Sequence, residues 1–133
     1  MRSLLLFAST AAALVAVVAS AQSPEAPDPQ KTFIDNCSAC HQEDGRGIAG
    51  AFPALAGDKF VIGPPTAPIG VVLQGRAGMP TFQADLTDGQ IAAALTYVRS
   101  AWGNKAPAVT PDQVKALRTG DAPLPDKRPM QAH

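Results

Sequence analysis

Aromatic residues, cysteines and net charge are all scarce in this sequence of 133 residues. Only 5% of the residues are Phe, Trp or Tyr, so a hydrophobic core built from this chain alone would be thin. Basic and acidic side chains balance at 11 each, which argues against nucleic acid as a partner, because nucleic-acid binding needs a basic surface. Two cysteines are too few for a disulfide-rich scaffold, and 13 prolines exclude an all-helical rod. The length allows one small domain.

The first 21 residues have the pattern of a secretory signal peptide. A positive start over residues 1–3 precedes a nearly continuous apolar run over 4–19, and Ala19-Ser20-Ala21 matches a small-residue cleavage site. The alternative is a membrane anchor, but the run is shorter than the ~20 residues of a membrane-spanning helix, and no positive cluster follows it. We expect cleavage after Ala21 and export to the periplasm, an oxidising compartment. Because Arg2 leaves with the signal, the mature net charge is −1.

Four helices are predicted in the mature chain, and no pair of strands. The first runs from about Pro29 to Cys40, with Asp28 as its N-cap. A short helix over residues 67–74 follows a proline-rich stretch. The clearest helix begins with a capping box at Thr87 and has apolar residues at helical spacing as far as Trp102. The fourth begins at Thr110 by the same logic and ends near Gly120.

These elements predict the organisation of the chain. Residues 22–28 form a proline-rich flexible leader, and residues 29–104 form one all-α domain. Residues 105–133 form a C-terminal extension that contains the fourth helix. Its last part, from Asp121 onwards, has three prolines and no apolar period, so we expect it to be disordered.

Residues Cys37 to His41 have the sequence C-x-x-C-H, the attachment signature of c-type haem. Two thiols three residues apart fall on one side of a helical turn, from which both can form thioether bonds along one edge of a porphyrin. The imidazole of His41 then lies under the iron. A covalently attached haem would add the large apolar body that this aromatic-poor domain lacks.

Two other interpretations of the cysteines are a thiol–disulfide redox motif and a zinc site. A redox motif would follow the strands of a βαβ unit, but fewer than 20 mature residues precede Cys37, and they include the leader. A zinc site needs four ligands, usually from two separated clusters. Only His133 and carboxylates could complete one. Both interpretations fit the sequence less well than haem does.

The second axial ligand of such an iron has few candidates, namely Met79, Met130 and His133. Met79 lies in a Gly-Met-Pro loop that can fold across the haem face opposite His41, and its glycine allows close backbone approach. A methionine that only fills a core is expected on an apolar helical face instead. Met130 and His133 lie in the expected tail, and an open or water-filled site is the remaining alternative. We therefore expect Met79 to be the ligand.

With these motifs the sequence resembles the class I monohaem c-type cytochromes over roughly residues 29–103. A third feature, Phe-Pro-Ala-Leu at 52–55, agrees with the resemblance. It implies that Pro53, 12 residues after His41, offers its carbonyl to the other ring nitrogen of the haem histidine. It also implies that Leu55 packs on the haem.

Two further phrases, at residues 72–82 and 91–104, resemble cytochromes and cytochrome domains that accept electrons from bacterial periplasmic dehydrogenases. The proline-rich stretch 63–68 and the tail after Asn104 depart from that pattern. The resemblance therefore implies redox protein partners: a dehydrogenase as donor, and a respiratory oxidase or another cytochrome as acceptor. It implies that the protein binds neither nucleic acid nor the membrane directly. It also implies that the protein is a monomer when it is free.

The resemblance implies a small class I cytochrome c fold, with three to four helices wrapped around one covalent haem c. In this fold the first helix packs on the last long one, so we expect Phe33 to contact Leu95, Tyr97 or Val98. Tyr97 and Trp102 could alternatively reach the haem propionates, as could Arg46 and Arg76, which are otherwise surface arginines.

An iron bound by His41 and Met79 has both axial positions filled, which favours one-electron transfer over catalysis. A haem enzyme or gas-binding protein with an open sixth position is the alternative. A third possibility is a structural role of the haem domain within a larger dehydrogenase.

Overall fold

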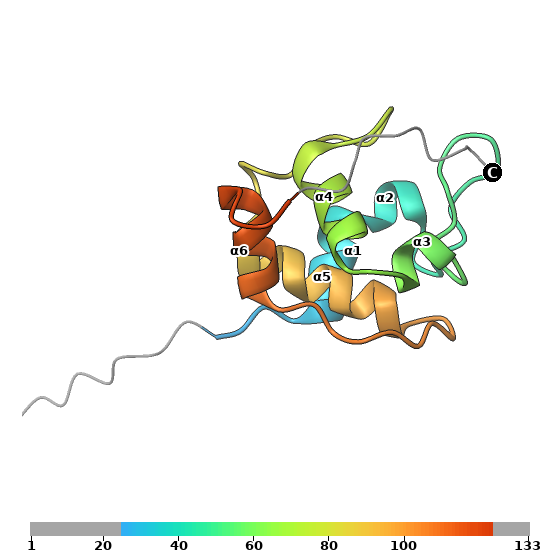
Figure 1. The fold of residues 1–133 in the computed structure, drawn as a ribbon. Coiled ribbons are helices and arrows are strands. Elements are labelled where there is room, and N and C mark those ends of the chain that lie inside the picture. Colours follow the sequence, from blue (N-terminus) through green and yellow to red (C-terminus); the bar gives the residue numbers. More distant parts are fainter. Residues whose placement is uncertain (1–24, 124–133) are drawn as a thin grey trace, which may run out of the picture.

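The computed structural model describes residues 25–123, which form six helices and no extended strand (Figure 1). The helices are α1 (Pro29–Asn36), α2 (Ser38–His41), α3 (Lys59–Ile62), α4 (Thr66–Gln74), α5 (Asp88–Ser100) and α6 (Pro111–Thr119). The predicted all-α class is confirmed. The expected signal peptide, residues 22–24 of the leader and residues 124–133 of the expected tail lie outside the described residues. Within 25–123, none of the helices has the length and apolar character needed to cross a membrane.

The helix starts follow the local signals in the sequence. Asp28 accepts a hydrogen bond from the Lys31 amide at 2.6 Å, and a proline opens α1. Thr87 and Thr110 form the two predicted capping boxes, each with a glutamine three residues later. The predicted boundaries of α4, α5 and α6 therefore agree with the structure to within about two residues.

The prediction of a single helix over residues 29–40 was wrong. Cys37 leaves helical geometry (φ −125°, ψ −31°), which separates α1 from the four-residue helix α2. A second short helix, α3, was also missed, because one turn is too short to show an apolar period. Its start is fixed by Asp58, whose carboxylate accepts from the Phe60 amide at 2.7 Å. These two single turns raise the predicted three to four helices to six in the described part.

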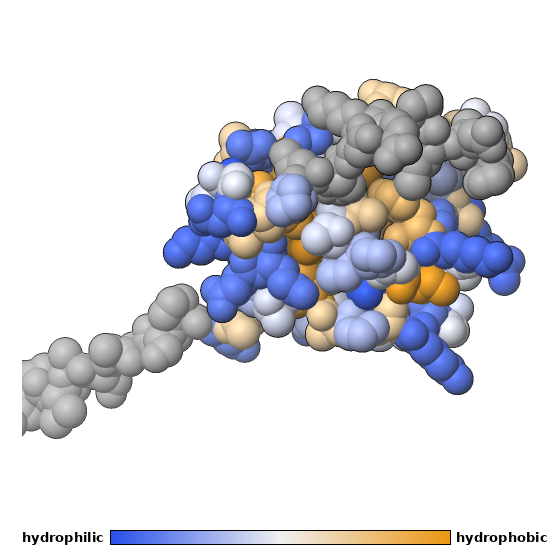
Figure 2. Space-filling view, viewed as in Figure 1, coloured by the Kyte–Doolittle hydropathy of each residue, from blue (hydrophilic) through white to orange (hydrophobic). Residues whose placement is uncertain are grey.

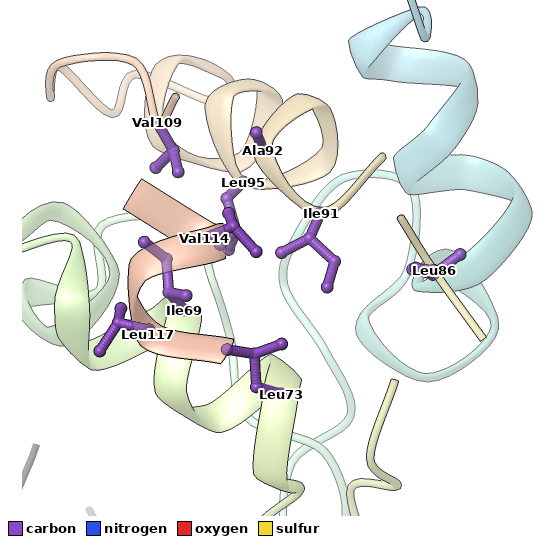
Figure 3. Packing of buried hydrophobic residues seen from close by; sticks show 9 residues of the cluster. All are labelled: Ile69, Leu73, Leu86, Ile91, Ala92, Leu95, Val109, Val114 and Leu117. Carbon is purple, nitrogen blue, oxygen red and sulfur yellow. The ribbon is translucent and has the colours of Figure 1, made fainter. Parts of the chain in front are cut away.

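The apolar residues of the domain form two clusters. The first joins α4, α5 and α6 and the segment before α5, so the C-terminal helix shares the core of the domain (Figure 3). Its buried members are Ile69, Leu73, Leu86, Ile91, Ala92, Leu95, Val109, Val114 and Leu117. The second cluster has Phe33, Val61 and Val98 at its centre, and partly buried side chains surround it.

The second cluster contains the expected contact between the first helix and α5. The rings of Phe33 and Tyr97 have centroids 5.3 Å apart, and Phe33 also packs with Val98 and Trp102. Leu95, the third expected partner, belongs to the first cluster instead. Hydrophobic residues reach the surface around α3 (Figure 2), where Phe60 is only partly buried. The chain therefore leaves the apolar surface of this cluster partly uncovered.

A buried arginine connects α5 to α3. Arg99 is 1% exposed, and its guanidinium donates to the carbonyls of Val61 (2.5 Å), Gly63 (2.8 Å) and Pro107 (2.9 Å). Burial lowers the pKa of this guanidinium from its usual value. The sequence did not predict this role, because arginine on a helix is usually solvated. One feature of the sequence did indicate burial of Arg99: it lies four residues after Leu95, on the apolar side of α5.

Replacing Arg99 with methionine should destabilise the protein strongly. Three carbonyls, one buried and two partly buried, lose their donor in R99M, so we expect the free energy of unfolding to fall by about 3 kcal/mol. The matched control is K105A, which removes an exposed positive charge nearby and should change stability by less than about 0.5 kcal/mol. Denaturant unfolding of both purified variants measures the difference. Equal stabilities would contradict the structural role of Arg99.

Candidate functional site

Cys37, Cys40 and His41 lie together in the tight turn around α2. The amides of Cys40 and His41 both donate to the Cys37 carbonyl, at 3.2 and 3.0 Å. Both cysteines are free thiols and partly buried. The two thiols are therefore held by one turn of backbone, directly before the imidazole.

The thiol of Cys37 is unsuited to thiolate chemistry in this fold. Burial, with a smaller contribution from Cys40, raises the pKa of Cys37 to about 11. Nucleophilic cysteines of thiol–disulfide enzymes have lowered pKa values instead, because the thiolate is the reactive form. This environment argues against the thiol–disulfide interpretation.

The imidazole of His41 is buried, with 8% exposure, and its Nδ1 lies 3.0 Å from the carbonyl oxygen of Pro53. A carbonyl can only accept, so Nδ1 carries the proton in this hydrogen bond. Nε2 then keeps its lone pair and is the nitrogen available to a metal. The structure thus brings His41 and Pro53 together in an arrangement that fixes both the tautomer and the ring orientation.

The loop that carries Pro53 is folded back onto His41 by backbone hydrogen bonds. The Gly47 amide donates to the His41 carbonyl at 2.9 Å, and the amides of Leu55 and Ala56 donate to the Gly45 carbonyl. Gly47 has φ +64°, and a Cβ at this position would lie 2.6 Å from the Pro53 carbonyl oxygen. A side chain there would displace the acceptor of the His41 proton, so position 47 requires glycine.

The same loop is anchored to the end of α5. The buried side chain of Asn104 donates to the carbonyls of Leu55 (3.0 Å) and Val98 (2.7 Å), and its oxygen accepts from the Gly57 amide at 2.7 Å. Trp102 donates to the Glu43 carbonyl at 3.0 Å. No role was predicted for Asn104 beyond the end of the phrase at residues 91–104. Its position in the chain carries no signal for a carbonyl and an amide nearly fifty residues earlier.

The remaining candidate residues divide between the second cluster and the loop before α5. Leu55 and Cys37 both pack against the second cluster, partly buried. Met79 belongs to neither cluster and lies partly buried in the loop between α4 and α5. Its amide and carbonyl pair with those of Arg76 at 2.8 and 3.0 Å, which makes a tight turn with an exposed tip at Ala77 and Gly78.

The side chains considered for propionate contact have partners within the protein. Tyr97 and Trp102 pack against each other and against Phe33. Arg46 is exposed, and its Nε lies 3.6 Å from Asp44. The guanidinium of Arg76 lies over the Phe60 ring, 5.9 Å from its centroid.

The arrangement fits a haem attached through thioethers. It provides two reduced thiols in one turn, an imidazole with Nε2 available, and an incompletely covered apolar cluster beside them. Within residues 25–123, no group of three or more His, Cys, Asp or Glu side chains lies together as an all-protein metal site.

Comparison with known proteins supports this assignment. Residues 24–98 match the family model described as cytochrome C oxidase, cbb3-type, subunit III. The chain is 36% identical over 106 residues to the cytochrome c subunit of the quinone alcohol dehydrogenase of Gluconacetobacter polyoxogenes, covering 70% of this chain and 23% of that subunit. It is 37% identical over 103 residues to cytochrome c-552 of Thermus thermophilus, covering 62% of this chain and 78% of the relative.

A solved structure, the c-type cytochrome KustC0563, has the same fold. It aligns with a TM-score of 0.50 at 23% identity, over 59% of this chain and 100% of that one. The predicted small class I fold and the resemblance stated from the motifs are thereby confirmed. The chain spans about a quarter of the length of the dehydrogenase subunit, so that subunit's activity and assembly describe the relative only.

Alanine at position 47 should disturb the His41–Pro53 hydrogen bond, whereas alanine at position 50 should not. Both glycines have positive φ, so G47A and G50A share about 1 kcal/mol of backbone strain. Only the Cβ at position 47 would clash with backbone atoms, which should lower the free energy of unfolding of G47A by roughly a further 1–3 kcal/mol. Denaturant unfolding and the NMR signal of the His41 Nδ1 proton measure the effect. An unshifted proton signal in G47A would contradict the proposed contact.

Proposed function

Since the chain belongs to the c-type cytochrome family, we propose that it is a periplasmic electron carrier whose haem c is held by Cys37, Cys40, His41 and Met79. Members of this family carry electrons and are not themselves enzymes, and their cofactor is one covalently attached haem c per domain of this size. When bound, the haem supplies reversible one-electron exchange at its iron.

The hydrogen bond between His41 Nδ1 and the Pro53 carbonyl is the observation that carries the proposal. It directs Nε2 towards a metal and increases the basicity of the imidazole. Cys37 and Cys40, in the same turn, are the thioether positions. Leu55 and Cys37 both pack against the cluster around Phe33, which gives the attachment turn an apolar side.

Met79 is proposed as the second axial ligand. It is partly buried, and its backbone pairing with Arg76 fixes the turn from which the thioether projects. A thioether opposite an imidazole favours the ferrous state relative to a second imidazole, which raises the potential. With both axial positions filled by the protein, no position remains for a substrate such as peroxide.

The proposed donor is a periplasmic dehydrogenase, and the proposed acceptor is a respiratory oxidase or another cytochrome. Support for the donor comes from the similarity to dehydrogenase cytochrome subunits, and support for the compartment comes from the signal-peptide pattern of residues 1–21. If the protein co-purifies with a large dehydrogenase subunit, it is a bound subunit of that enzyme. If it purifies without one, it is a free electron shuttle.

Electron transfer to partners should depend only mildly on salt. The proposed rim of the haem edge consists of Ala39, Gln42, Ala77 and Gly78, which carry no charge, and the mature net charge is −1. Long-range steering is therefore weak. Stopped-flow measurement with the dehydrogenase that reduces the protein, at low and at physiological ionic strength, should give rates within about threefold of each other. A steep fall with salt would contradict an uncharged contact.

Visible spectra of the protein matured in a periplasm that attaches haem test the ligand assignment. Wild-type protein should show reduced haem c bands and the weak far-red ferric band of a thioether–iron bond. M79A should lose the far-red band and bind carbon monoxide when reduced, because the sixth position opens. M130A is the matched control and should behave as wild type. A wild-type protein without the far-red band that binds carbon monoxide would favour a gas-binding protein or haem enzyme.

A further inference from the structure

The loop that carries Met79 is bound at its C-terminal end by one arginine from α6. Arg118 donates through its guanidinium to the carbonyls of Gln83 and Leu86, the latter at 2.9 Å. Its Nε also donates to the carboxylate of Asp88 at 2.7 Å. The Arg118 side chain is 21% exposed and that of Asp88 28%, so the charge-assisted contacts with Asp88 and Leu86 are partly buried, while the contact with Gln83 is exposed.

Arg118 projects from a helix that is itself fixed in the core. Val114 and Leu117 of α6 are 0% and 3% exposed and pack with Ile69 and Leu73 of α4 (Figure 3). The capping box at Thr110 fixes the start of the same helix. The guanidinium is therefore held by a rigid element, and the loop residues it binds have little freedom to move away from α4 and α5.

The bound segment continues directly into the turn that contains Met79. Thr81 donates to the Leu73 carbonyl at 2.5 Å, and the Phe82 amide donates to the Val72 carbonyl at 2.9 Å. Thr81 and Phe82 are thus bound to α4, and Arg118 binds Gln83, Leu86 and Asp88. Met79 lies two residues before Thr81, so displacement of this segment would displace the thioether as well.

We propose that Arg118 is a positioning residue for the sixth iron ligand. By binding the Gln83 and Leu86 carbonyls, it holds the loop in the conformation that keeps Met79 on the iron. The inference rests on the proposed function, in which Met79 is an axial ligand. Loss of the guanidinium removes two carbonyl contacts and one ion pair, so the loop opens more often while α6 stays packed through Val114 and Leu117.

Four variants of the mature holoprotein test the proposal. R118A removes all three contacts, R118K can keep only the ion pair with Asp88, and D88N removes the ion pair but leaves both carbonyl contacts. K115A is the matched control, because it removes an equal charge from an exposed position on α6. The readouts are the carbon monoxide binding rate of the reduced protein, and thermal melts of the far-red band and of helicity.

Carbon monoxide should bind R118A about tenfold faster than wild type, because it waits for Met79 to leave the iron. The far-red band of R118A should melt well below the loss of helicity. In both readouts R118K should give values between those of wild type and R118A. The values of D88N should lie closer to wild type than those of R118K, and K115A should match wild type. If R118A does not mature, R118K compared with K115A gives the same test.

Two outcomes overturn the inference while leaving the proposed function intact. In one, R118A and R118K bind carbon monoxide at the K115A rate. In the other, the far-red band and helicity of R118A melt together, which would make Arg118 a general stabilising residue only. If wild-type protein lacks the far-red band, the assignment of Met79 fails first, and with it the basis of this inference.

Discussion

The hydrogen bond from His41 to the Pro53 carbonyl is the constraint on which the rest of the site depends. A backbone carbonyl can accept this bond only if its loop is held in place, and the loop is held from two sides. Gly47 allows the close approach on one side, and Asn104 binds Leu55 and Gly57 on the other. The segment that follows α5 therefore helps to determine the orientation of an imidazole on α2.

The two clusters support different parts of the proposed site. The second cluster, around Phe33 and Val98, supports the attachment turn and the Pro53 loop. The first cluster, around Ile69 and Val114, supports the loop that carries Met79. Helix α5 contributes to both and is joined to α3 by Arg99, so the two proposed axial ligands are positioned from opposite parts of a single helix.

The local signals of the sequence predicted the helix starts and the haem motif, because capping boxes and C-x-x-C-H act over a few residues. The supports of the site could not be predicted in the same way. Arg99, Asn104 and Arg118 all bind backbone carbonyls in distant segments. A carbonyl has no residue identity, so such contacts leave no pattern in the sequence. The break at Cys37 likewise has no neighbouring glycine or proline that would mark it in the sequence.

The partial burial of Cys37 has a consequence for biogenesis. Its thiol packs against a cluster completed by Val98 and Trp102, which lie far along the chain. Under the proposed export, the mature chain enters the periplasm from its N-terminal end, so the attachment turn emerges well before these packing partners. The Cys37 thiol would then be open to haem attachment during that interval and would become shielded once α5 docks. On the proposed function, the position of α5 in the sequence would therefore place covalent attachment before folding.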